Sequence, residues 1–227
     1  MKIGKHKIKE ENKPHIGEKR KWKIDPWQHQ AKFLDEYGIP SYNLIKSMVE
    51  RIQDARVKAL VSIMYLTGGR IGEVLHIKRI NVSLPIINGK EYLKVHMINE
   101  KQQNTHNRTK DILCASVERD TELIQAFLIY VNSGIITFAD ERIFNITPQR
   151  VHVLLKKHAK LYVETNESYM TPHLFRHIRA THLSEQQDYN LFELMKFLGW
   201  ITLDMATRYV KPNQNVMAKK LDKESNE

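Results

Sequence analysis

The spacing of apolar residues predicts helices over most of the chain. Between Tyr42 and Leu66 the apolar positions recur at helical spacing in two pieces, and Asp54 is the expected N-cap of the second piece. Leu60, Ile63 and Met64 fall on one face of that second piece. We therefore expect two consecutive helices here, the second buried through this face.

Turn and cap residues mark the other helices. Ser41 is the expected cap of the first helix above, and Gly68-Gly69 interrupts the pattern after the second. Thr-Pro pairs at 147–148 and 171–172 each combine an N-cap with a proline at the first helical position. The helices expected from these signals span residues 70–80, 117–131, 147–163, 171–183, 191–198 and 202–208.

A different pattern, typical of short strands, occupies residues 82–114. Positions 93–97 alternate between apolar and polar, and Asn88-Gly89 is a strong hairpin signal. The polar residues 99–110 are expected to form a longer hairpin loop, with 111–114 as its return strand. The predicted fold class is therefore mixed, mainly α with a small three-stranded antiparallel β-sheet.

Charge adds the first hint about partners. The 227 residues include 36 Lys and Arg against 26 Asp and Glu, a formal net charge of +10. Residues 1–23 hold nine of these cations and three Glu, a net of +6, and segment 1–25 is expected to be a flexible basic arm. Such a charge favours a polyanion such as DNA, RNA or acidic lipid, although a solvated tail that only aids solubility accounts for it equally well.

Composition also excludes several classes of protein. There is no run of about 18 apolar residues that could span a membrane, and the polar start of the chain lacks the apolar stretch of a secretion signal. Cys114 is the single cysteine, so an internal disulfide and a thiolate-cluster zinc site are ruled out. These features favour a reducing intracellular compartment and no membrane partner.

Two arginines stand where they could bind a phosphate. Arg70 follows the Gly68-Gly69 turn and Arg176 follows the second Thr-Pro pair, so each lies beside a helix N-terminus with free backbone N–H groups. His173, Arg176 and His177 fall along one side of the same expected helix. Surface arginines and histidines that support buried carbonyls fit the same pattern, and a three-histidine metal site that includes His182 lacks a carboxylate partner.

A tyrosine near the C-terminus is the last candidate. Leu198-Gly199-Trp200 is followed nine positions after Trp200 by Tyr209. Taken alone, a tyrosine at a helix end is most often structural, with its ring packed and its hydroxyl in water.

In combination, these segments resemble the catalytic domain of the tyrosine recombinase (phage integrase) family. Residues 67–75, Thr-Gly-Gly-Arg-Ile-Gly-Glu-Val-Leu, look like the first arginine box of that family. Residues 172–183, which include Pro-His-Leu-Phe-Arg-His, look like the second box, and 198–209 look like the third, which ends on the nucleophile. Three boxes in this order are far more specific than any one of them. The resemblance covers about residues 42–212.

By position, the resemblance implies a catalytic set with no cofactor and no metal: Arg70, Lys101, His173, Arg176, Trp200 and Tyr209. The two arginines and His173 would hold the scissile phosphate. Lys101 is the family's hairpin lysine by its place after the strand at 93–98, and Lys110 and Lys94 are the alternatives.

Two further residues have implied supporting roles. Glu73 resembles an acidic residue that orients the first arginine, although an exposed helix charge is the plain alternative. His177 looks like a helix-supporting histidine that lies closer to Tyr209 than to the phosphate.

The implied reaction is site-specific cleavage and rejoining of DNA through a 3′-phosphotyrosine at Tyr209. Attack on a phosphodiester gathers negative charge that two guanidinium groups can stabilise. A cationic site is expected to lower the pKa of the Tyr209 phenol, and Lys101 is expected to protonate the leaving 5′-oxygen. The covalent intermediate keeps the bond energy of the broken strand, so neither ATP nor a metal is required.

The resemblance also implies partners and boundaries. The partners are double-stranded DNA and a homo-tetramer assembled on it, in the cytoplasm. Residues 26–212 would form the catalytic domain and 213–227 a tail that packs on a neighbouring protomer. Only about forty residues precede the match, as in minimal integrases of archaeal viruses and plasmids or in a truncated chain.

Two other functions remain open at this point. One is a type IB topoisomerase-like relaxase that acts as a monomer. The other is a non-catalytic DNA-binding protein derived from a recombinase.

Overall fold

The computed structural model of the chain describes residues 26–98 and 109–209. The expected basic arm and C-terminal tail lie outside these residues, so both remain predictions. In chain order the elements are α1 (Pro26–Tyr37), α2 (Tyr42–Arg51), α3 (Ala55–Thr67), α4 (Ile71–Leu75), η1 (Arg79–Asn81), β1 (Val82–Ser83), β2 (Ile86–Ile87), β3 (Lys90–Ile98), β4 (Thr109–Ser116), α5 (Thr121–Val131), α6 (Pro148–His158), α7 (Pro172–Gln186), α8 (Leu191–Leu198) and α9 (Leu203–Thr207).

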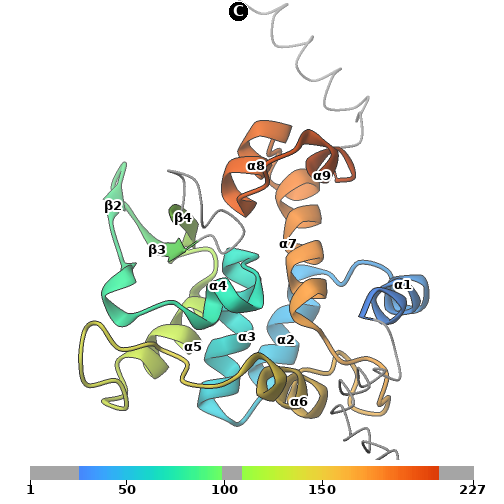
Figure 1. Ribbon diagram of the computed structural model, residues 1–227, viewed down its shortest axis with the longest axis horizontal. Coiled ribbons are helices and arrows are strands. Elements are labelled where there is room, and N and C mark those ends of the chain that lie inside the picture. The colour runs from blue at the N-terminus through green and yellow to red at the C-terminus, as the bar shows by residue number, and fades with distance from the viewer. Residues whose placement is uncertain (1–25, 99–108, 210–227) are drawn as a thin grey trace, which may run out of the picture.

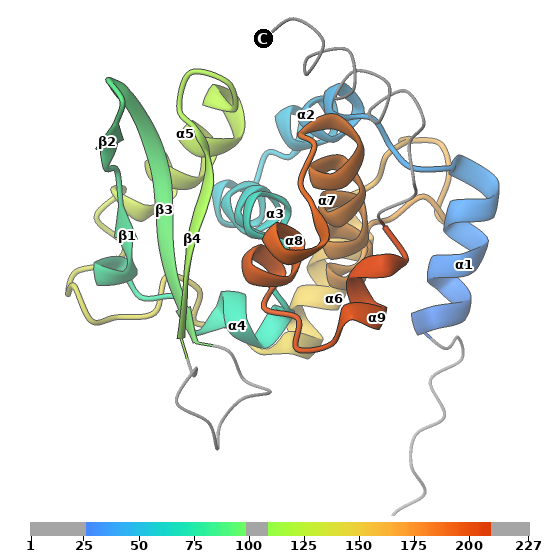
Figure 2. The same cartoon turned by 90° about the horizontal axis from the view of Figure 1, so that it is seen from above.

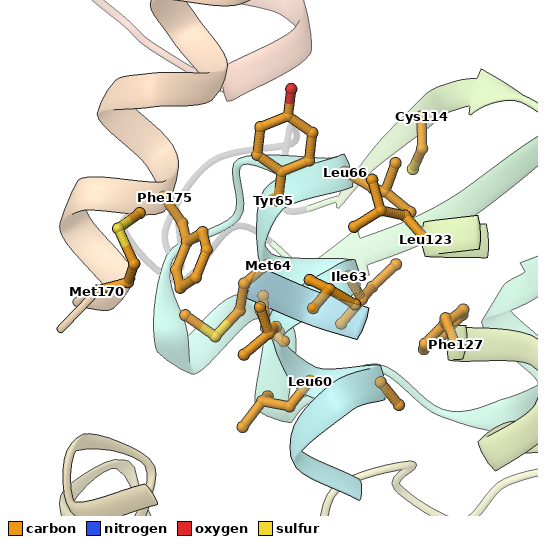
Figure 3. Packing of buried hydrophobic residues seen from close by; sticks show 14 of the residues in the cluster. Leu60, Ile63, Met64, Tyr65, Leu66, Cys114, Leu123, Phe127, Met170 and Phe175 are labelled. Atoms are coloured by element: carbon orange, nitrogen blue, oxygen red, sulfur yellow. The ribbon is translucent and has the colours of Figure 1, made fainter. Parts of the chain in front are cut away.

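Helix α3 forms the centre of the molecule. The strands lie on one side of the helical body and α1 on the opposite side, in both Figure 1 and Figure 2. Helices α5 and α7 pack against α3, and Figure 3 shows Phe127 of α5 and Phe175 of α7 on either side of it. Every residue from Ala59 to Thr67 is buried, so α3 is covered all round and not only on the expected face. This burial fixes the turn that follows α3, from which the first candidate arginine extends.

The small sheet is built on β3. Strands β1 and β2 pair antiparallel with different parts of β3, and β4 pairs along it. Asn88 and Gly89 connect β2 to β3 with φ values of 51° and 76°, which confirms the hairpin turn. The mainly helical fold with a small antiparallel sheet is therefore confirmed. Strand β4 begins at Thr109, so the prediction that Lys110 belongs to the preceding loop was wrong.

Short-range capping signals were predicted well. The side chains of Ser41 and Asp54 accept hydrogen bonds from the backbone N–H groups of Leu44 and Val57, at 3.3 and 3.1 Å. The Thr-Pro pairs at 147–148 and 171–172 open α6 and α7 as expected. Each cap satisfies backbone donors that a helix start leaves without a partner.

Two helices end earlier than the sequence pattern predicts. Helix α4 ends at Leu75 and not at residue 80, because the carbonyl of Ile77 accepts from Ile143 N at 2.9 Å and not from a further helical turn. Helix α6 ends at His158 and not at 163, because Lys160 forms a bridge with Tyr169. In both places a partner outside the helix, 66 positions away for Ile77 and nine for Lys160, takes the backbone groups that the next helical turn would use.

At its N-terminus, α5 begins at Thr121, four residues later than expected. Across the described ranges, no helix combines the length and apolar character needed to cross a bilayer.

Candidate active site

Arg70 and Lys110 meet at one buried carboxylate. Gly68, with a left-handed φ of 56°, ends α3 and leaves Arg70 at the N-cap of α4. Glu73, three residues on, accepts from the Arg70 backbone N–H at 3.0 Å and from its Nη1 at 2.8 Å. Lys110 Nζ, from β4, donates to Glu73 Oε2, the oxygen that also accepts from the Arg70 backbone N–H, at 2.9 Å. The Glu73 side chain has 0% exposure, so the alternative of an exposed helix charge was wrong.

The charges of this cluster shift one another's pKa values. Burial raises the pKa of the Glu73 carboxyl, but Lys110 and the Arg70 backbone N–H outweigh burial and hold that pKa below its ordinary value. Burial lowers the pKa of the Lys110 ammonium, and Arg176 and Arg70 lower it further, against the attraction of Glu73. The lysine is thus prepared to release a proton more readily than a lysine in water.

Arg176 brings the second box into the same cluster. It extends from the first turns of α7, is 5% exposed, and donates to the carbonyl oxygens of Gly68 and Leu198, both at 2.7 Å. Lys110 Nζ donates to the same Leu198 carbonyl at 3.3 Å. Burial and the neighbouring Arg70 lower the pKa of the Arg176 guanidinium to about 10, so it remains charged at neutral pH. Three cations therefore lie around a single carboxylate.

Trp200 connects this cationic cluster to Tyr209. The Arg176 guanidinium carbon lies 5.5 Å from the Trp200 ring centre, and the Tyr209 ring stacks on Trp200 with centroids 5.2 Å apart and planes 17° apart. Ser184 of α7 holds the backbone of Tyr209 by donating to its carbonyl oxygen at 2.8 Å. The tyrosine is thus placed by contacts with α7 and with Trp200, which follows the C-cap of α8.

The phenol oxygen of Tyr209 contacts His177. The distance from His177 Nδ1 to the phenol oxygen is 2.8 Å. Burial raises the pKa of the Tyr209 phenol, and the opposing effects of Arg176 and Arg208 are smaller. The prediction that the cationic site lowers this pKa was therefore wrong in its net direction, because desolvation of the half-buried ring exceeds the attraction of the guanidinium groups.

The remaining candidates from the sequence are His173, Lys101 and the three-histidine metal site. His173 lies exposed in the first turn of α7, one turn before His177. Lys101 lies outside the described residues, so its role stays a prediction, while its alternative Lys110 is in the cluster. The three-histidine metal alternative was wrong, because His182 uses Nδ1 on the Tyr65 hydroxyl at 2.8 Å and Nε2 on the Pro40 carbonyl at 2.9 Å.

Sequence reasoning missed two residues around this site. Ser184 has no distinguishing signal in the sequence. Arg179, 2% exposed, lies three positions after Arg176, and a cation so deep in a helix of buried positions could have been suspected from the apolar residues on both sides of it.

Comparisons with known proteins concern the family and the fold of the chain. The model of the phage integrase family matches residues 41–215. The crystal structure of XerA recombinase shares 18% identity and a TM-score of 0.55, over 82% of this chain and 64% of that chain. A pre-cleavage complex of XerH site-specific recombinase bound to its difH substrate shares 18% identity and a TM-score of 0.54, over 78% of this chain and 50% of that chain.

A post-cleavage XerH complex on a palindromic difH substrate has the same identity and TM-score, over 81% and 50% of the two chains. This chain therefore spans between half and two thirds of the length of these solved chains, and at such identity the likeness concerns the fold. Among curated protein sequences, no significant match to the chain is found.

Proposed function

Because the chain belongs to the phage integrase family of tyrosine recombinases, we propose that it cleaves and rejoins DNA through a phosphotyrosine bond at Tyr209. The proposed substrate is a scissile phosphate of double-stranded DNA. XerH, a structural neighbour, is bound to its difH substrate, which supports a DNA duplex as the partner. A tetramer on two paired sites is the assembly that we propose for strand exchange.

One observation carries this proposal. Arg70 and Arg176, more than a hundred residues apart, lie in a continuous set of contacts that reaches Tyr209 through the Trp200 ring. Arg70 and Tyr209 both influence the pKa of Arg176, so the two guanidinium groups and the phenol lie within range of one another's electrostatic effects. Guanidinium groups beside a nucleophile are suited to a phosphodiester, whose non-bridging oxygens gain charge during attack.

Lys110 is our candidate for the general acid. The bond from the Tyr209 oxygen to phosphorus forms as the bond from phosphorus to the 5′-oxygen breaks, and the leaving alkoxide needs a proton. Lys110 has a lowered pKa and lies between Glu73 and the Leu198 carbonyl that also binds Arg176. An ammonium with a lowered pKa transfers its proton more easily, which is the requirement for this step.

Covalent capture of DNA tests the proposal directly. The probe is a library of DNA duplexes with a randomised central segment and a nick, so that the cleaved end diffuses away and the intermediate accumulates. The wild-type chain should form a protein–DNA adduct that survives denaturation, and Tyr209→Phe should form none. An adduct that persists in Tyr209→Phe would reject Tyr209 as the nucleophile, and a wild-type chain without any adduct would reject the enzyme.

The two lysines can be separated with the recovered site. Lys110→Ala should reduce single-turnover cleavage by about 100- to 10,000-fold, the usual contribution of a general acid. Lys101→Ala is the matched variant and should retain cleavage within about tenfold. The reverse result would return the acid role to Lys101.

A further inference from the structure

The state of Tyr209 raises a question about its proton. A phenol attacks phosphorus well only as it loses its proton, and burial holds the pKa of this phenol above its ordinary value. The guanidinium groups of Arg176 and Arg208 favour the phenolate but cannot accept a proton. The site as proposed above therefore has an acid for the leaving group and needs a proton acceptor for the nucleophile.

His177 has the geometry of such an acceptor. Its Nδ1 lies 2.8 Å from the phenol oxygen, and the two rings are 5.0 Å apart at their centroids with a tilt of 58°. His177 is half-buried in α7 and directly follows Arg176 in the chain. Ser184, two helical turns further along α7, holds the tyrosine backbone, so the same helix supports both groups.

We infer that His177 is the catalytic base that receives the phenol proton when Tyr209 attacks the DNA phosphate. The inference rests on the proposed function and adds a residue to it. Neutral imidazole with its proton on Nε2 offers Nδ1 as an acceptor to the phenol.

The proton transfers balance between the two halves of the reaction. In cleavage, the phenol proton moves to Nδ1 of His177 as the bond from oxygen to phosphorus forms, and the Lys110 ammonium gives one proton to the departing 5′-oxygen. In ligation, the 5′-hydroxyl attacks, Lys110 takes back its proton, and the His177 imidazolium protonates the departing phenolate. Each step conserves protons and electrons without a metal or a further reagent.

The surroundings of His177 favour its neutral form. Burial lowers the pKa of the imidazole below its ordinary value. From its own helix, Arg176 is adjacent and His173 lies one turn earlier, and from the end of α9 Arg208 stands next to Tyr209. A neutral imidazole at neutral pH can accept a proton, whereas a protonated one cannot.

The matched variants separate proton transfer from positioning. His177→Asn keeps an amide oxygen that can accept the hydroxyl hydrogen bond but cannot be protonated. We expect it to lose about 100- to 10,000-fold in single-turnover cleavage while it keeps DNA binding and melting temperature. Ser184→Ala, which removes only a backbone contact of Tyr209, is the positioning control and should leave the shape of the pH–rate profile unchanged.

The pH profile supplies a second readout, and its wild-type half does not depend on any variant. In the wild type, cleavage should fall as the pH drops through the lowered pKa of His177, and fall again at high pH where the Lys110 ammonium, whose pKa is also lowered, loses its proton. In His177→Asn the acid-side fall should lose its His177 midpoint, and the rate should rise about tenfold per pH unit through neutral pH until Lys110 loses its proton. A wild-type rate that itself rises in that way through neutral pH would overturn the inference.

A sulfur substrate distinguishes the base from the acid. Duplexes in which sulfur replaces the bridging 5′-oxygen release a thiolate, which needs no proton. The defect of Lys110→Ala should largely disappear on this substrate, and the defect of His177→Asn should persist. If sulfur restores both variants equally, His177 is not the base.

Failure of this inference is distinct from failure of the proposed function. A wild-type chain that forms an adduct through Tyr209, together with normal cleavage by His177→Asn, rejects only the base. A wild-type chain that forms no adduct rejects the enzyme reading itself.

Discussion

Arg176 and Arg179 lie three positions apart on α7 and are almost equally buried, at 5% and 2% exposure, yet their electrostatic surroundings differ. Arg176 donates to two backbone carbonyls and has Arg70 close enough to lower its pKa. Arg179 donates to the Cys114 carbonyl at 2.6 Å, and its guanidinium carbon lies 5.2 Å from the Tyr65 ring and 5.6 Å from the Phe197 ring.

This difference suits Arg176 to binding a ligand and Arg179 to stabilising the fold. Both guanidinium groups lie near aromatic faces, Arg179 near two rings and Arg176 near the Trp200 ring, but Arg176 also has a neighbouring arginine that lowers its pKa. Arg176 stands beside other cations, and the repulsion among them is relieved when an anion enters. A buried cation in the surroundings of Arg176 is expected where a phosphate binds, and it lowers the stability of the empty site.

The largest effect should come from Arg176→Met, which keeps the length of the stem and removes the charge. Losing one donor to the developing charge should reduce cleavage by about 100- to 1,000-fold. Relief of the repulsion from other cations should offset much of the cost of leaving the Gly68 and Leu198 carbonyls without this donor, so the free energy of unfolding should change little. Urea denaturation and single-turnover cleavage measure the two quantities, and a variant that loses both stability and DNA binding would make Arg176 a structural residue like Arg179.

Glu73→Gln should have the next largest effect, now on stability. The buried carboxylate holds both Arg70 and Lys110, and breaking a buried ion pair while its cations remain should cost about 3 kcal/mol. Because the pKa of Glu73 is lowered in the folded state, its stabilisation is present above the ordinary carboxyl pKa and is lost as pH falls through the lowered one. The urea midpoints of the wild type and of Glu73→Gln should therefore differ at neutral pH and become similar at acid pH. Parallel curves would contradict this account.

Arg179 offers the matched structural test. Arg179→Ala leaves a cavity beside Tyr65 and Phe197 and an unmatched Cys114 carbonyl, so we expect a loss of about 3 kcal/mol. Arg179→Met fills most of the space and should cost less than about 1.5 kcal/mol. Both variants should form the covalent adduct whenever they are folded. A folded Arg179→Met without cleavage would place this arginine in the site and erase the contrast with Arg176.

Local signals in the sequence predicted what local physics controls. The caps at Ser41 and Asp54 and the Asn88-Gly89 turn each depend on neighbours within a few residues. The ends of α4 and α6 could not be predicted in this way, because segments outside each helix take their backbone groups.

The candidate site shows the same division. Its motif residues were identified from chain order, and the structure brings Arg70, Arg176, Trp200 and Tyr209 together. The net direction of the Tyr209 pKa was not predictable, since it depends on how far burial exceeds the attraction of the arginines. The presence of Lys110 in the cluster depends in turn on where β4 begins, which sequence pattern placed two residues too late.

The smallest effect concerns the acid stability of the region around Arg179. Burial, with a further contribution from Arg179, lowers the pKa of His182 to about 4 despite its hydrogen bond to the Pro40 carbonyl. As the pH falls below about 6.5, the imidazole of His182 is protonated in the unfolded chain before it is protonated in the folded chain. The free energy of unfolding is therefore highest above pH 6.5 and decreases as the pH falls toward 4.

Between pH 6.5 and 4.5 this linkage amounts to about 2 kcal/mol of unfolding free energy. Urea denaturation of the wild type should show that loss, and His182→Gln should show little of it. Arg179→Met should reduce the loss modestly, because the nearby cation no longer opposes protonation of His182. An unchanged pH dependence in His182→Gln would mean that groups other than His182 control acid stability. It would also mean that Arg179 does not affect acid stability through His182.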